Sequence, residues 1–120
     1  MNIEFIENGS NDKIALIKSD AIEINEYQDA LDIMANCGYM DARKIIMYKS
    51  NITPDFFDLK TRLAGEILQK FSNYRVRLAI IGDFSEFKSK SLTDFIYESN
   101  KHGHVVFVET LDEAINKLGR

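Results

Sequence analysis

The sequence has one cysteine, one proline and no long apolar run, and each shortage narrows what the protein can be. The single thiol, Cys37, cannot form an internal disulfide, which agrees with a reducing compartment. No run of apolar residues reaches the roughly 18 needed to span a bilayer, so no membrane span is expected. The first ten residues lack the basic and apolar regions of a secretory signal. These features predict a cytoplasmic protein.

The sequence also lacks a large excess of either acidic or basic residues. The chain carries 19 acidic and 15 basic residues, interspersed, for a net charge of −4, so it offers no broad cationic field for nucleic acid. The apolar fraction of 45% and charged fraction of 28% are those of an ordinary folded protein. A chain of 120 residues can bury about two-thirds of its unfolded surface, which predicts one domain over residues 1–120.

Hydrophobic periodicity alternates between strand and helix patterns along the chain. Ile3 and Phe5 alternate with polar residues, and residues 8–12 have turn chemistry before the apolar run 13–17, which predicts an opening hairpin. Later strands are expected at 44–48, 76–81 and 104–108, and helices at 25–38, 58–71, 91–99 and 110–118.

Helix ends are expected where capping residues are spaced three apart. The expected pairs are Asn25 with Gln28, Ser91 with Asp94, and Thr110 with Glu113, with Asp58 as the cap of the second helix and Gly38 and Gly119 as stops. Gly65, inside the second helix, is expected to let another backbone approach closely.

The resulting order, β-β-α-β-α-β-α-β-α, predicts an α/β fold with a mixed, mostly parallel sheet of about five strands and helices packed against it. Ligand and partner sites in such sheets gather beyond the carboxyl ends of the strands. The two loops at this edge are Lys49–Asp58 and Asp83–Lys90.

The first of these loops contains Phe56 and Phe57. In a regular helical or strand pattern, two adjacent side chains in a short turn would not both point into the core. One exposed ring suits a binding surface, because an aromatic side chain buries much area at low entropic cost. Alternatively, both rings fold down as a lid over the core.

Hydroxyl groups in the same region, at Thr53 and Thr61, stand near an expected helix start, where a phosphate would meet free N–H groups. We expect Thr61 to be the third residue of that helix. A phosphorylation switch is one interpretation, and a threonine that bonds only to backbone is the other.

Catalysis or ion binding is a further option at this edge. Asp55, Asp58 and Asp83 could converge there, and Ser85 lies in a loop with two lysines that could hold one anionic group. Turn and cap roles, or a solvated loop, account for the same residues. No dinucleotide or P-loop glycine pattern is present, so no cofactor is expected.

Two further groups of residues carry weak signals. His102 and His104 lie without a ligand constellation, so no metal and no catalytic residue are assigned. Cys37 has no neighbouring histidine in sequence, and inert packing at the end of a helix is expected.

The order of elements resembles the STAS-like fold of bacterial anti-sigma-factor antagonists (sporulation stage II AA-like). Two sequence segments are similar to domain-of-unknown-function family 4180: NITPDFFDLKTRLAGEILQKFSNYRVRLAIIGDFS and SKSLTDFIYESN. In typical antagonists an Asp-Ser-Ser-Gly motif at the start of the second helix carries a phosphorylated serine. Here Asp58 matches, but Leu59 and Lys60 replace the serines and the glycine is absent, so the resemblance implies binding at this surface without that switch.

We therefore expect a bacterial regulatory or protein-interaction module that docks a protein partner through the loop after the third strand and the start of the second helix. The candidate contact residues are Thr53, Asp55, Phe56, Phe57, Asp58, Thr61, Asp83 and Ser85. The alternative is a small-molecule site or enzyme at the same edge, with Asp55, Asp58, Asp83 and Ser85 as its lining. A homodimer is a third possibility.

Overall fold

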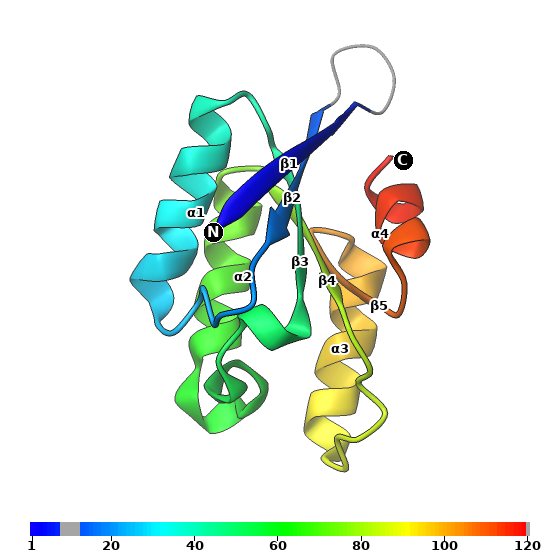
Figure 1. Ribbon diagram of the computed structural model, residues 1–120. Helices are drawn as coiled ribbons and strands as arrows, with labels where there is room; N and C mark the ends of the chain where they lie inside the picture. The colour runs from blue at the N-terminus through cyan, green and yellow to red at the C-terminus, as the bar shows by residue number, and fades with distance from the viewer. Residues whose placement is uncertain (8–12, 120) are drawn as a thin grey trace.

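The computed structural model describes residues 1–7 and 13–119, and its elements follow the order expected from the sequence (Figure 1). The strands are β1 (Asn2–Glu7), β2 (Lys13–Lys18), β3 (Lys44–Tyr48), β4 (Arg77–Ile81) and β5 (Val105–Val108), and the helices are α1 (Tyr27–Tyr39), α2 (Leu63–Asn73), α3 (Lys90–His102) and α4 (Leu111–Leu118). Three short 3-10 turns, η1 (Lys49–Asn51), η2 (Pro54–Phe57) and η3 (Leu59–Thr61), connect β3 to α2. The predicted α/β fold is confirmed.

The five strands form one sheet in the order β1-β2-β3-β4-β5. β1 and β2 pair antiparallel, with Phe5 opposite Ala15, which confirms the opening hairpin; its expected turn lies outside the described residues. The other three pairings are parallel. The carboxyl ends of β3, β4 and β5 therefore lie at one edge, at the bottom of Figure 1.

Helices cover the two faces of the sheet unequally. α1, α2 and α3 pack on one face, and α4 packs on the other (Figure 1). Alternate residues of each central strand serve the two faces, as the period of two requires. In β3, for example, Ile45 and Met47 face the three-helix layer, whereas Ile46 belongs to the cluster that α4 covers through Ala114 and Leu118.

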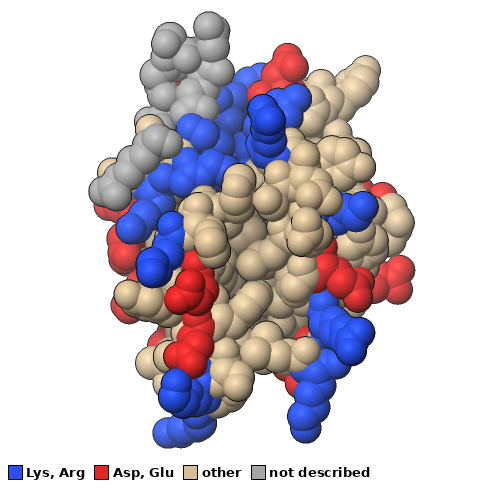
Figure 2. Space-filling view, turned by 180° about the vertical axis from the view of Figure 1, so that it is seen from behind, with Lys and Arg blue, Asp and Glu red and all other residues tan. Residues whose placement is uncertain are grey.

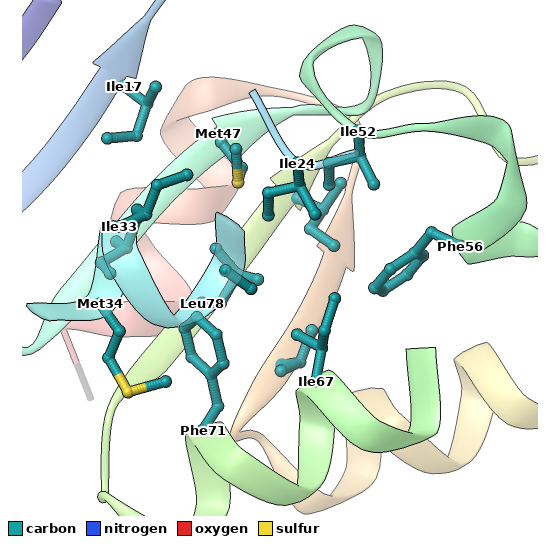
Figure 3. Packing of buried hydrophobic residues seen from close by; sticks show 14 of the residues in the cluster. Ile17, Ile24, Ile33, Met34, Met47, Ile52, Phe56, Ile67, Phe71 and Leu78 are labelled. Atoms are coloured by element: carbon teal, nitrogen blue, oxygen red, sulfur yellow. The ribbon is translucent and has the colours of Figure 1, made fainter. Parts of the chain in front are cut away.

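The larger core lies between the three-helix layer and the sheet (Figure 3). Ile67 and Phe71 of α2 are both about 1% exposed and pack beside Leu78 of β4. In the sequence, Leu59, Leu63, Ile67 and Phe71 are four residues apart and predict one apolar face of the second helix; the last three lie in α2, whereas Leu59 lies in η3.

Several helix ends differ from the prediction. α1 is capped by Glu26, not Asn25, and Asp29 accepts hydrogen bonds from the backbone N–H groups of both residues at 2.9–3.1 Å. It also continues past Gly38, which was expected to end it, to Tyr39.

The later helices show the same kind of shift. α2 starts at Leu63, because Asp58 caps the short turn η3 instead of the helix. α3 is capped by Ser89, whose hydroxyl accepts from the Leu92 N–H, and not by Ser91. The Thr110 cap of α4 is confirmed, with its hydroxyl 3.1 Å from the Glu113 nitrogen.

Two small residues, Gly65 and Cys37, test further expectations from the sequence. A Cβ at Gly65 would meet no atom within 4 Å, so the expected close backbone approach is wrong. Cys37 is fully buried, and burial raises the pKa of its thiol to about 11, which fits the expected inert packing. Across residues 1–7 and 13–119, no helix is long and apolar enough to cross a membrane.

Candidate functional site

The segment between β3 and α2 folds as three successive 3-10 turns at the carboxyl edge of the sheet. Pro54 suits the first position of η2, since its missing N–H would have no partner there. Because 3-10 turns bond residues three apart, each turn fixes only a few residues. The order of the whole segment therefore also depends on contacts with the rest of the chain.

Asn51 is the most deeply buried of these side chains, at 1% exposure. Its Nδ2 donates to the carbonyls of Ser19 and Ala21, each at 2.9 Å, and its Oδ1 accepts from the Tyr48 N–H at 3.2 Å. The Asn51 carbonyl accepts the N–H groups of Glu23 and Ile24. One residue thus ties the linker between β2 and α1 to the loop after β3.

Thr61 fastens the other half of the segment. Its hydroxyl lies 2.7 Å from the Asp55 carbonyl and 2.8 Å from the Asp58 carbonyl, and its oxygen accepts the Leu63 N–H at 3.2 Å. The expected place of Thr61 inside the helix is wrong, because it lies in η3, two residues before α2. The backbone-bonding role expected as an alternative is what the geometry shows.

Phe56 and Phe57 turn inward, with exposures of 1% and 8%. Figure 3 shows Phe56 pointing from its loop toward Ile67. Phe57 lies edge-on to Phe56, with ring centroids 5.0 Å apart, and stacks on Phe87 at 5.0 Å. With Phe84 and Phe107, these rings form a cluster of five phenylalanines that joins the two loops to β5. The expectation of an exposed ring is wrong, and the lid is what the structure shows.

Lys49 connects the two loops, with its Nζ over the Phe84 and Phe87 rings of this cluster. Its Nζ donates to the Asp83 carbonyl at 3.0 Å, forms an ion pair with Glu86 and lies 4.8 Å from the Phe87 ring centroid. A Cβ at Gly82 would lie only 2.6 Å from the Lys49 Cβ. The absence of a side chain at position 82 is what allows the lysine stem to pass.

Asp83 and Ser85 form a local turn of their own. The Asp83 Oδ1 accepts from both the backbone N–H and the hydroxyl of Ser85, at 2.9 and 2.6 Å. These two bonds lower the pKa of the Asp83 carboxyl below its ordinary value. Thr53 and Asp58 make similar short-range bonds, to the N–H groups of Asp55 and Lys60.

A surface pocket of about 380 Å³ lies between the two loops. Its lining residues are Ile22, Lys49, Ser50, Ile52, Pro54, Phe57, Glu86 and Phe87. Of the eight residues proposed from the sequence, only Phe57 lines it. The structure brings Thr53, Asp55, Asp58 and Thr61 together in one hydrogen-bonded surface, and it joins Asp83 to Ser85, but it does not gather Asp55, Asp58 and Asp83 around this pocket.

No metal centre is apparent in the part of the chain that the structure describes, where no three His, Cys, Asp or Glu side chains are grouped to hold an ion. Sequence reasoning missed Asn51 and Lys49. The β3–β4 register, which pairs Tyr48 with Ile81 and so puts Lys49 and Gly82 side by side, explains the contact of Lys49 but cannot be read from the sequence.

A five-stranded mixed sheet with three helices on one face and one on the other is a STAS-like fold. The chain belongs to the family described as "Domain of unknown function (DUF4180)", whose model matches residues 9–118. A crystal structure from Thermotoga maritima, described as that of a candidate anti-sigma factor antagonist, shares the fold. It has 16% sequence identity and a TM-score of 0.50, with 99% of this chain and 94% of that chain covered. A comparison with curated proteins finds no match.

Proposed function

We propose that this chain is a single-domain regulatory module of the bacterial cytoplasm that docks a protein partner on the surface formed by Thr53, Asp55, Asp58 and Thr61. The likeness of fold to a candidate anti-sigma factor antagonist supports a regulatory role. The buried phenylalanines support this surface from below instead of contacting the partner.

The observation that carries the proposal is the fixed conformation of an exposed polar segment. Asp55, Asp58 and Thr61 are exposed, yet their backbone is tied by the Thr61 hydroxyl and anchored through Asn51. A surface that is already ordered loses less conformational entropy on binding. Irregular segments on rigid scaffolds are also where binding residues concentrate.

Charge indicates what such a partner offers. The segments at this edge, residues 19–26, 49–62 and 82–88, contain seven acidic and four basic residues. A partner face that carries lysine or arginine would complement this excess and be steered toward it.

The test is affinity capture from the native host with the wild-type chain and the double variant Asp55→Lys/Asp58→Lys, with captured proteins identified by mass spectrometry. We expect a partner that the wild type retains and the double variant loses. The double variant Asp32→Lys/Glu98→Lys, at exposed sites on α1 and α3, supplies the matched charge change and should retain the partner. Equal capture by the wild type and the double variant would remove this surface from consideration.

A small-molecule site at the same edge is the second candidate, and the 380 Å³ pocket beside Lys49 and Phe57 supports it. Its volume lies within the range of ligand sites, about 300–1,000 Å³. A thermal-shift screen of metabolites tests it, since a ligand in excess raises the melting temperature. Asp83→Asn should leave such a shift unchanged, because Asp83 does not line the pocket, whereas Phe87→Ala should remove it.

A further inference from the structure

A second pocket of about 380 Å³ lies at the other end of the sheet, between the last turns of α1 and the start of β4. Its lining residues are Leu31, Met34, Ala35, Gly38, Arg43, Tyr74 and Val76. None of them belongs to the docking surface proposed above. We refer to this site as the Arg43 pocket.

The floor of the Arg43 pocket is apolar. Met34 and Val76 are 7% and 5% exposed, and Leu31 is half-buried beside them. Figure 3 shows Met34 at the margin of the core, next to Phe71. A methionine here can adapt its shape to an incoming group, because its side chain is unbranched and polarizable. Gly38 adds no side chain, and a Cβ there would meet no atom within 4 Å.

Exposed aromatic and apolar residues line the pocket or follow one of its lining residues in the sequence. Tyr39 is 89% exposed, Tyr74 57% and Met40 45%, and Tyr39 and Met40 directly follow Gly38 along the chain. Tyrosine and arginine are enriched among the residues that dominate binding energy at protein interfaces. An apolar pocket flanked by both residue types is the composition of a binding site for a protein segment.

The charge at this end is positive. Residues 39–44, 70–77 and 101–104 contain six lysines and arginines and one acidic residue, Asp41. Figure 2 shows lysine and arginine side chains gathered at this upper end of the molecule. Part of the excess serves the fold, because Arg43 donates to the Tyr74 carbonyl at 3.3 Å and Arg77 donates to carbonyls at the ends of α3 and α4. Arg43 still has further N–H donors, since a guanidinium carries five.

These features select one kind of occupant. A carboxylate can pair with Arg43 while an adjacent aliphatic or aromatic side chain fills the space between Leu31 and Val76. A second copy of the chain, placed by a two-fold axis on this pocket, would bring Arg43 close to the Arg43 of that copy. Charge complementarity therefore favours an acidic partner over self-association.

We propose that the Arg43 pocket binds an acidic segment of a protein, with one aliphatic or aromatic side chain in the pocket and a neighbouring carboxylate on Arg43. The site is independent of the surface formed by Thr53, Asp55, Asp58 and Thr61, so one chain can hold two partners at opposite ends of its sheet.

The probe is a library of random dodecapeptides displayed on phage and selected against the full chain, with enriched peptides then measured by fluorescence anisotropy. We expect the enriched peptides to carry leucine, isoleucine or phenylalanine next to aspartate or glutamate. Arg43→Glu should weaken their binding by about tenfold or more, and added salt should weaken it further. Failure to enrich such peptides, or equal binding by Arg43→Glu, would overturn the proposal.

Two further variants separate recognition from folding. Tyr74→Ala changes a pocket-lining side chain that is 57% exposed, so it should keep the wild-type melting curve while it weakens peptide binding by about fivefold. Lys88→Glu makes the same charge reversal at the other end of the sheet and should bind the peptides as the wild type does. Sedimentation velocity provides a last check, because a dimer that Arg43→Glu dissociates would make a second copy the occupant and overturn the proposal.

Discussion

The two ends of the sheet use aromatic residues in opposite ways. At the carboxyl ends of the strands, Phe56 and Phe57 turn inward, and their cluster holds two loops on the core. At the other end, Tyr39 and Tyr74 remain exposed, and Tyr74 lines an apolar pocket. The comparison teaches that an aromatic pair in a loop does not by itself mark a contact surface. What distinguishes the two ends is whether other elements pack over the rings.

The ends also differ in charge and in how their backbone is held. The carboxyl end has an acidic excess and a backbone fixed by Asn51 and Thr61, whereas the opposite end has a basic excess that partly neutralises helix carboxyl termini. Each end therefore has its own kind of partner in our account, and the following changes test the distinction.

The largest expected effect is that of Phe56→Ala, which removes a fully buried ring from the cluster. We expect it to lower the free energy of unfolding by about 3–5 kcal/mol, because a cavity replaces the ring. Urea denaturation measures this. Tyr39→Ala is the matched change at the opposite end and should leave the stability within about 0.5 kcal/mol of the wild type. Equal effects of the two variants would remove the distinction between inward and outward rings.

Asn51→Leu comes next. It keeps a side chain of similar size but leaves the Ser19 and Ala21 carbonyls and the Tyr48 N–H without their partner. We expect a loss of about 2–4 kcal/mol, since unsatisfied buried groups carry their full desolvation cost. Ser50→Ala, at the exposed neighbouring position, is the control. A loss below about 0.5 kcal/mol for Asn51→Leu would show that the segment does not depend on this side chain.

Gly82→Ala and Gly65→Ala make the same chemical change with opposite expected signs. The new methyl group at position 82 would meet the Lys49 Cβ at 2.6 Å, so we expect a loss of about 1–3 kcal/mol from overpacking. At position 65 it meets nothing within 4 Å in a helix, which predicts a gain of about 0.5–1 kcal/mol. Thermal unfolding of both variants measures these two changes in stability. A Gly82→Ala protein as stable as the wild type would mean that the Lys49 side chain does not pack against position 82.

Cys37, which is buried in the larger core, gives a smaller, pH-dependent effect. Its folded pKa, about 11, lies above the ordinary value of 9.0, so the folded state holds the thiol proton more tightly. The stabilisation is complete below pH 9 and is lost as pH rises toward 11, by at most about 1.4 kcal/mol per pH unit. The difference in unfolding free energy between wild type and Cys37→Ala isolates this contribution from other titrating groups. A difference that stays constant from pH 8 to 11 would contradict the burial of the thiol.

The sequence predicts the fold well because its periodic segments are long. The steps of four at Leu63, Ile67 and Phe71 and the apolar runs of β3 and β4 each specify one type of element, and their alternation specifies the sheet. Helix ends are less predictable, because neighbouring residues compete for the same cap. Asn25 and Glu26 both donate to Asp29, and only the geometry of the chain entering α1 decides which one is the cap.

The candidate site is predictable in position but not in architecture. The topology places the 49–62 segment at the carboxyl edge, yet the direction of Phe57 depends on Phe84 and Phe87, which come from a different loop. Asn51 is missed for the same reason, since its partners lie about 30 residues away in the chain. The residues next to Phe57 and Asn51 in the sequence do not predict such long-range contacts.

Amide hydrogen exchange of the free chain tests the central claim most directly, because it reports whether the 49–62 segment is ordered before any partner binds. The account predicts that the N–H groups of Ile24 and Thr53, which donate to the carbonyls of Asn51 and Ile24 at 3.0 and 2.8 Å, exchange as slowly as those of β3. Exchange of these amides at the rate of an unstructured peptide would contradict it.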